Sequence, residues 1–198
     1  MPANIVGMAR VLVLLGHPST DSYNGHLADR LVEGLGVAGH QVRRVDVGSM
    51  SFDPVLHEGY RVIQPLEPDL IAFQRDLRWC EHWVVIYHLW WWSSPAVLRG
   101  LVDRAIHPGF AFLSDGPLVT PLLGGRTGHL VTTMDASASY VTQAYGDSDL
   151  VEWQVAIMKF CGIAAGAVVR IGEVNFLTRD QRIAEDDRAV AEIVAAVG

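Results

Sequence analysis

The sequence has few cysteines, fewer basic than acidic residues and no long apolar run. Its two cysteines, Cys80 and Cys161, form neither a CxxC motif nor a zinc-binding spacing, so we expect buried free thiols and a reducing compartment. The net charge of -7 argues against general nucleic-acid binding, which requires a basic face. No apolar stretch approaches the roughly 18 residues that span a bilayer, so we expect no membrane insertion.

Several sequence signatures are also missing. The segment Met1–Ala9 carries no positive residue before the apolar run Val11–Leu15, which argues against a signal peptide and predicts a cytoplasmic protein. No GxSxG elbow occurs, and His57-Glu58 lacks the second histidine of a zinc-protease helix. We therefore expect neither a serine hydrolase nor a metal site. A length of 198 residues with 50% hydrophobic residues predicts one ordered domain over residues 1–198.

Apolar runs alternate with helical stripes along the chain. The runs predict strands at residues 11–15, 42–47, 83–87, 130–133 and 167–171. The stripes predict helices around residues 27–36, from Pro68, from Pro95, around 150–161 and over 180–197. Residues 48–65 and 107–126 are expected to be long connections. This order predicts an α/β fold, a doubly wound five-stranded parallel sheet with helices on both faces.

Ligands of such sheets bind beyond the carboxyl ends of the strands, which here selects the loops 16–24, 88–94 and 132–140. In the first loop, Ser22 and Asn24 precede or begin a helix and can donate to phosphate oxygens, while His17 can supply partial positive charge. This loop carries no GxGxxG fingerprint. The alternative interpretation of the same residues is ordinary capping of the helix.

The second loop contains three consecutive tryptophans, Trp90, Trp91 and Trp92. Neither a strand nor a helix can bury three adjacent indoles on one face. A loop that wraps a large flat ligand can, so we predict a planar aromatic cofactor, with a flavin as the leading candidate. The alternative is two core tryptophans and one at a subunit contact.

The third loop follows a predicted strand that ends in Thr132 and Thr133. Backbone N–H groups and hydroxyls there could meet the carbonyl edge of a flavin ring, and Tyr140 can donate a proton or a hydrogen bond. The alternatives are plain strand propensity for the threonines and a surface position for Tyr140.

Five sequence elements occur together in a specific order. They are His17-Pro18 with Ser22-Tyr23-Asn24, the stretch Leu89–Gly100, Pro108–Phe112, Thr132-Thr133 and Phe160-Cys161-Gly162. In this order the chain resembles the flavodoxin-like NAD(P)H:quinone oxidoreductases, the DT-diaphorase family with its bacterial relatives. The resemblance runs from about residue 11 to residue 183.

The resemblance implies a set of cofactor-binding positions. Those on the phosphate side of the flavin match His17, Ser22, Tyr23 and Asn24. Those against the isoalloxazine match Leu89, Trp90, Trp91 and Trp92, and those on its other edge match Thr132, Thr133, Met134 and Asp135. Gln74 and Arg182 match contacts to the adenosine half, which favours FAD over FMN. Tyr140 matches the catalytic tyrosine above the ring.

The chain also departs from the family pattern. His88 stands where the family usually has proline, and Trp90 replaces a smaller residue. Met134 and Asp135 replace glycines. The histidine expected six positions after the tyrosine is Gly146, so the tyrosine must act alone or with water.

The implied function is flavin-dependent oxidation of NAD(P)H. In this interpretation a hydride passes from reduced nicotinamide to flavin N5 and then to a quinone or similar flat acceptor, in a ping-pong mechanism. We also expect a homodimer, because the Trp cluster and Phe110-Ala111-Phe112 offer more apolar surface than a monomer usually exposes. Two alternatives remain, a flavodoxin-type electron carrier and a flavin-binding regulatory subunit of a membrane transporter.

Overall fold

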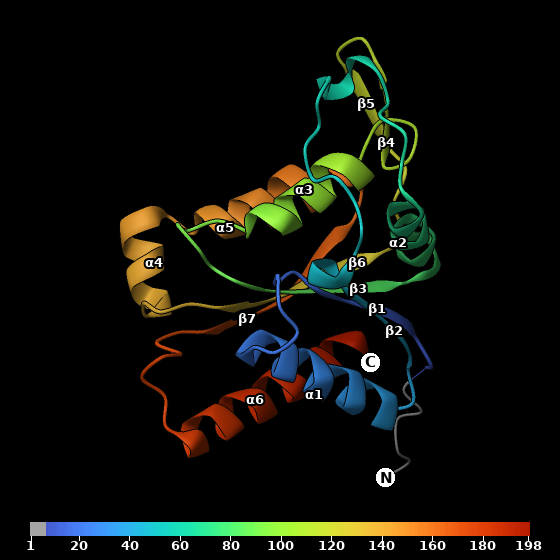
Figure 1. Cartoon of the computed structure of the whole chain (residues 1–198). Helices are drawn as coiled ribbons and strands as arrows, with labels where there is room; N and C mark the ends of the chain where they lie inside the picture. Colours follow the sequence, from blue (N-terminus) through green and yellow to red (C-terminus); the bar gives the residue numbers. More distant parts are fainter. Residues whose placement is uncertain (1–6) are drawn as a thin grey trace.

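A computed structural model describes residues 7–198, and its centre is a five-stranded parallel sheet (Figure 1). The strands lie in the spatial order β2 (Gln41–Asp46), β1 (Arg10–Leu15), β3 (His82–His88), β6 (Thr127–Thr133) and β7 (Ala164–Ile171). All neighbouring strands of this sheet are parallel, which confirms the predicted doubly wound fold. The beginning of Met1–Ala9, where no signal peptide is expected, lies outside the described residues.

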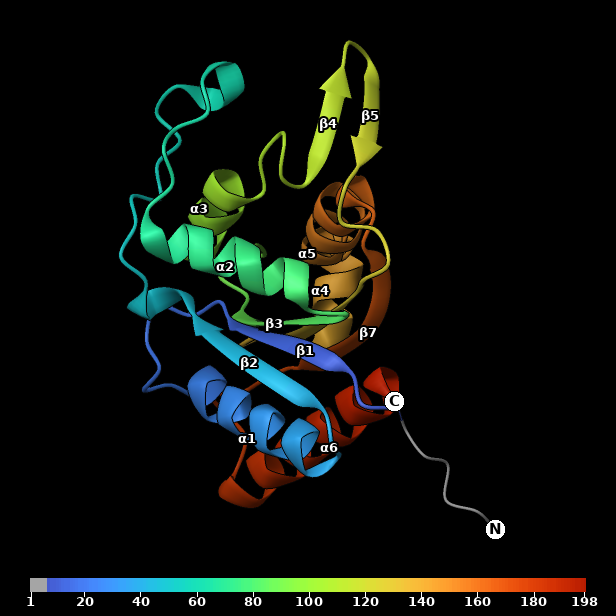
Figure 2. The ribbon, with the colours of Figure 1, turned by 90° about the vertical axis from the view of Figure 1, so that its right-hand side faces the viewer.

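Helices cover both faces of the sheet (Figures 1 and 2). One face carries α1 (Tyr23–Val37) and α6 (Arg179–Val197). The other face carries α2 (Pro68–Trp79), α3 (Ala96–Ala105) and the run formed by α4 (Ala138–Tyr145), α5 (Ser148–Leu150) and the π-helix η3 (Val151–Lys159). Two short 3₁₀ helices, η1 (Val47–Ser49) and η2 (Gly59–Arg61), lie in the connection between β2 and α2.

Strand β1 shows how the sequence builds two cores. Leu12 and Leu14 are fully buried on the side of α2 and α3, whereas Val11, Val13 and Leu15 are fully buried on the side of α1 and α6. Burying one such side chain contributes about 1.5–3 kcal/mol. Strands covered on both faces therefore read as unbroken apolar runs, which is why the sequence located them.

The structure contains elements that the sequence did not predict, among them helix α4, which begins within the expected loop 132–140, and a β-hairpin. The connection 107–126 contains an antiparallel hairpin, β4 (Phe112–Asp115) and β5 (Leu118–Pro121), which projects away from the sheet (Figure 2). The hairpin turns at Gly116, whose φ of 59° suits glycine. Its strands are mostly exposed, so they lack the buried apolar run by which the other strands were predicted.

Cys80 and Cys161 are buried and free, as predicted. Burial raises the pKa of Cys80 to about 12 and that of Cys161 to about 11, so neither thiol is activated. Among residues 7–198, no helix is both long and apolar enough to cross a membrane.

Candidate functional site

The three loops selected by topology converge at one edge of the sheet around two adjoining cavities. The first cavity, of about 380 Å³, is lined by aromatic side chains together with Leu89, Asp135 and Ala136. The second, of about 260 Å³, lies against the N-terminus of α1 and is lined by His17, Asn24 and other polar residues. Trp90 and Asp135 line both cavities. We call the first the aromatic cavity and the second the polar cavity.

The tryptophan loop turns sharply at the end of β3. Trp91 and Trp92 have positive φ angles of 51° and 61°, a rare conformation for residues other than glycine. Backbone hydrogen bonds in both directions between Trp90 and Ser93, of 3.2 and 3.0 Å, close the turn. A strained backbone conformation persists only where surrounding contacts stabilise it, and such conformations are concentrated at functional sites.

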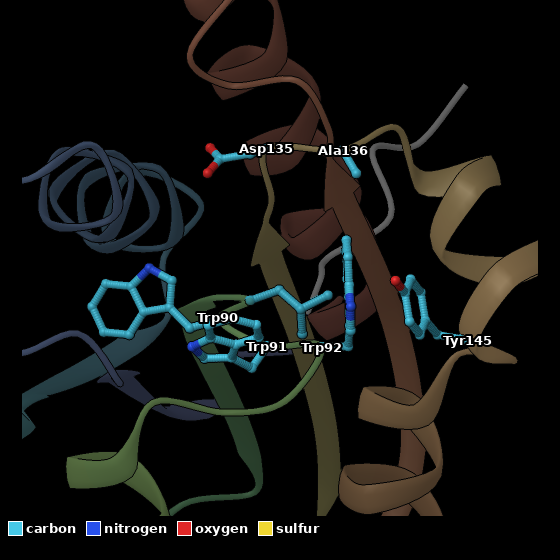
Figure 3. A pocket seen from close by; sticks show the side chains of 7 residues that line it. Trp90, Trp91, Trp92, Asp135, Ala136 and Tyr145 are labelled. Atoms are coloured by element: carbon cyan, nitrogen blue, oxygen red, sulfur yellow. The ribbon is translucent and has the colours of Figure 1, made fainter.

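The turn sends the three indoles in different directions (Figure 3). Trp90 points towards α1, with its ring 5.4 Å from that of His17. Trp92 stacks on Tyr145 at a centroid distance of 4.2 Å. Trp91 lines the aromatic cavity but is 96% exposed, so a single chain does not bury it.

Side chains of the next elements hold this loop in place. Glu152 accepts hydrogen bonds of 3.0 Å from the hydroxyls of Ser93 and Ser94. Trp153 donates its indole N–H to Ser94 Oγ at 3.0 Å, and Ser148 Oγ donates to the carbonyl of Trp92 at 2.9 Å. The first residue of α5 and the N-terminal part of η3 therefore fix the strained turn.

Several residues that line the aromatic cavity have backbone donors without a partner. The N–H groups of Trp91, Trp92, Asp135 and Ala136 have no hydrogen-bond partner among residues 7–198. The N–H of Leu89 is not available, because it donates to the carbonyl of Thr133 at 2.8 Å. An aromatic cavity edged by free N–H groups fits a flat ring that carries carbonyl and nitrogen acceptors.

The polar cavity contains one buried donor without a partner. Asn24 is 3% exposed and accepts a 2.8 Å hydrogen bond from Thr133 at Oδ1, while its Nδ2 has no partner in the described chain. Ser22 caps α1 by accepting from the N–H of Gly25 at 3.1 Å, so the capping interpretation holds for Ser22. An unsatisfied buried amide at a helix N-terminus fits a bound anion.

Tyr23 and Arg182 lie on the outer side of this helix terminus. Burial and a 2.8 Å hydrogen bond to Asp186 raise the pKa of Tyr23. The guanidinium of Arg182 lies 5.6 Å from the Tyr23 ring centroid and donates to the carbonyl of Val174 at 3.0 Å. These residues border a further cavity of about 490 Å³, lined also by Arg30 and Arg179. The structure thus brings Arg182 to the predicted phosphate side.

Five predicted contact residues do not line the cavities: Gln74, Thr132, Thr133, Met134 and Tyr140. Thr132 is fully buried on the opposite face of β6 from Thr133. Met134 is fully buried, and its N–H and carbonyl are bonded to Ile171 and Val174. Gln74 donates to the carbonyl of Ala105 at 2.8 Å, between α2 and the end of α3. The predictions for Thr132 and Met134 were wrong for backbone reasons. Side chains alternate along β6, so Thr132 faces away from Thr133, and the backbone turns again at Met134.

Comparison with known proteins identifies the family to which this fold belongs. Residues 9–195 match the family model described as "Flavodoxin-like fold". The chain belongs to this family. NAD(P)H dehydrogenase [quinone] 1 of Rattus norvegicus is 25% identical over 185 residues, which cover 79% of this chain and 66% of the rat protein. The chain thus spans slightly less than two thirds of that relative, and the curated match confirms the resemblance drawn from the sequence.

Solved structures show the same flavodoxin-like fold. NAD(P)H:quinone oxidoreductase from Methanothermobacter marburgensis superposes with a TM-score of 0.78 at 20% identity, covering 93% of this chain and 97% of that one. An FMN-dependent NADH-azoreductase from Bacillus anthracis, solved in complex with FMN, has a TM-score of 0.72 at 15% identity. That match covers 95% of this chain and 98% of the azoreductase.

Several residues of this site were not predicted from the sequence, Tyr145 and His88 among them. Tyr145 lines the aromatic cavity beside Tyr140, and their ring centroids are 6.0 Å apart. It precedes Gly146, the position where a histidine was expected, and Gly146 instead caps α4 with a φ of 62°. His88 lines the polar cavity. Its position at the end of a predicted strand could have indicated a site residue, but the sequence analysis noted it only as a departure from the family pattern.

Proposed function

We propose that this protein is a flavin-dependent NAD(P)H oxidoreductase that reduces a quinone or a similar flat acceptor. The observation that carries the proposal is the junction of an aromatic cavity, edged by free N–H groups, with a polar cavity that contains the unpartnered amide of Asn24. The name of the curated rat relative supports the choice of substrates. A bound flavin would supply the hydride chemistry between nicotinamide and acceptor.

The residues that line the two cavities fit a flavin whose ring lies in the aromatic cavity and whose phosphate lies in the polar cavity. The aromatic cavity would hold the ring, with Trp92 and Tyr145 excluding water from one side. Asn24 Nδ2 and the N-terminus of α1 would hold the phosphate. We place FAD before FMN because the cavity beside Tyr23 offers Arg30, Arg179 and Arg182 to a longer anionic group.

Tyr140 is the proposed catalytic residue. Its side chain lies edge-on to Trp92 at 6.1 Å, and it is half exposed. The neighbouring Tyr145 raises the pKa of Tyr140, so the Tyr140 hydroxyl stays protonated and can donate at neutral pH. That donor would stabilise negative charge that develops on the acceptor during reduction.

We further propose a homodimer in the cytoplasm. Exposed apolar side chains gather on the β4–β5 hairpin, on η3 and directly after η3: Leu113, Leu118, Val119, Val151, Val155 and Phe160. A monomer rarely leaves so many large apolar side chains on neighbouring elements uncovered. The free buried thiols Cys80 and Cys161 support a reducing compartment.

Flavin binding and turnover test the proposal directly. Protein stripped of cofactor is titrated with FAD, FMN and riboflavin, and quenching of flavin fluorescence gives each Kd. The flavin-loaded protein is then assayed for NADH and NADPH oxidation with a benzoquinone. Asn24→Asp places a carboxylate beside the phosphate, so we expect Kd for FAD to rise about tenfold or more while riboflavin changes less. Failure of both FAD and FMN to bind at micromolar concentration would overturn the proposal.

A further inference from the structure

His88 occupies a wall of the polar cavity. It ends β3, its side chain is 13% exposed, and its ring lies 5.8 Å from that of Trp90, which lines both cavities. Three other ionisable residues border the same cavity, His17, Tyr23 and Asp135, and the raised pKa of Tyr23 keeps its phenol neutral. The lining contains no lysine or arginine among the described residues. A bound anion would therefore meet no fixed positive charge there.

Hydrogen bonding fixes which nitrogen of His88 carries the proton. Thr133 donates its single hydroxyl proton to Oδ1 of Asn24 at 2.8 Å. The hydroxyl oxygen can then only accept from Nδ1 of His88, which lies 2.9 Å away. Nδ1 is therefore protonated, and Nε2 of the neutral ring presents a lone pair 3.9 Å from the carboxylate of Asp135.

The charges around His88 favour the neutral ring in the free protein. Burial lowers the pKa of His88, and His17, on the loop after β1, lowers it further. Asp135, on the loop after β6, acts in the opposite direction. The remaining neighbours, Thr133 of β6 and Asn24 of α1, are uncharged. Negative charge placed in the cavity would raise this pKa, because it stabilises the protonated ring.

We propose that His88 takes up one proton at Nε2 when the polar cavity binds an anion. The proton comes from solvent, and no other bond changes. Two observations mark the cavity as an anion site: it lies at the N-terminus of the 15-residue helix α1, and the buried Nδ2 of Asn24 has no partner. Protonated His88 supplies the missing positive charge and offsets the repulsion between the anion and Asp135. The inference rests on the proposed function where the anion is the flavin diphosphate.

FAD is the right probe, because its diphosphate keeps its charge between pH 6 and pH 8, whereas the phosphate of FMN titrates near pH 6. Proton uptake strengthens binding as the pH falls through the pKa of His88 in the complex, and the gain ends below its pKa in the free protein. We expect FAD to bind about five- to tenfold more tightly at pH 6 than at pH 8. Calorimetry in buffers of different ionisation enthalpy should show net proton uptake.

Three variants assign the proton. His88→Asn keeps a donor to Thr133 but removes Nε2, so it should lose the pH dependence and the proton uptake without losing the fold. His17→Gln should weaken FAD binding and keep the pH dependence, which separates the two histidines. His57→Gln alters an exposed histidine outside both cavities and should behave as wild type. Unchanged pH dependence in His88→Asn would overturn the inference.

Nitrogen-15 NMR of the free protein separates this inference from the proposed function. The His88 ring should show the Nδ1–H tautomer, and inorganic pyrophosphate should raise its pKa. If FAD binds without proton uptake, the inference fails and the proposed function stands. If no flavin binds but pyrophosphate raises the pKa of His88, the function fails and the inference stands. The absence of both responses overturns both.

Discussion

The indole of Trp92 stacks on the phenol ring of Tyr145, with centroids 4.2 Å apart and planes 22° apart. Trp92 comes from the strained turn after β3, and Tyr145 is the last residue of α4. Tyr140 stands edge-on to both rings, at 6.1 and 6.0 Å. The three side chains form one aromatic wall that presents two phenol hydroxyls, where the sequence had predicted one.

Tyr140→Phe should lower turnover by roughly tenfold and leave flavin binding intact, because a single hydrogen-bond donor contributes less than a full acid–base group. Stopped-flow measurement of the two half-reactions would locate the loss. Tyr145→Phe should have a similar or smaller effect, and the double variant should lose less than the two effects added together, because the hydroxyls act as a pair. Unchanged rates in both half-reactions would reduce Tyr140 to a packing partner of Trp92 and Tyr145.

Arg182→Ala should weaken FAD binding more than FMN binding, because Arg182 borders the cavity that extends beyond the phosphate side. Loss of one charge-assisted hydrogen bond corresponds to about 1.5–3 kcal/mol, or roughly tenfold or more in Kd. Arg188→Ala is the matched control, since Arg188 lies on the same helix and pairs with Glu185 and Glu192. Equal losses for FAD and FMN would remove the argument for FAD.

Light scattering should give a mass of twice the 21.7 kDa of one chain. Val155→Glu places a charge among the exposed apolar side chains of η3, where Val155 is 53% exposed, and should shift the protein to monomer. Val37→Glu is the control, because Val37 is 84% exposed at the end of α1 on the other side of the sheet. A wild-type monomer at assay concentration would contradict the dimer.

The protein should lose stability as the pH falls from 6.5. His129 is 1% exposed, accepts from the N–H of Ala167 at 3.1 Å, and lies 3.0 Å from Nδ1 of His82. Burial and His82 lower the pKa of His129 to about 4, so the folded state holds the ring neutral while the unfolded chain binds a proton below pH 6.5. Stability is complete above pH 6.5 and declines towards pH 4, by about 2 kcal/mol at pH 5.

Denaturant unfolding at pH 7 and pH 5 measures this decline. His129→Gln should flatten the difference between the two pH values, because glutamine does not titrate. His57→Gln should leave the difference unchanged, since the His57 side chain is 59% exposed. The same difference in His129→Gln as in wild type would assign the acid sensitivity to other groups.

The sequence by itself determined the sheet and the position of the site. Strands such as β1 are buried on both faces and read as unbroken apolar runs, and Pro68 marks the first turn of α2. Parallel strands then place their carboxyl ends at one edge, so the loops 16–24, 88–94 and 132–140 had to meet. The spacing of apolar residues and the order of strands and helices along the chain are sufficient to place the site at this edge.

Only the tertiary structure decided which side chains face the cavities. The positive φ angles of Trp91 and Trp92 turn three adjacent indoles in three directions, and no local pattern encodes that turn. Thr132 and Thr133 point to opposite faces of β6, so just one of them meets Asn24, which lies far away in the sequence. Side-chain direction at a loop depends on contacts between distant segments, which spacing along one chain does not specify.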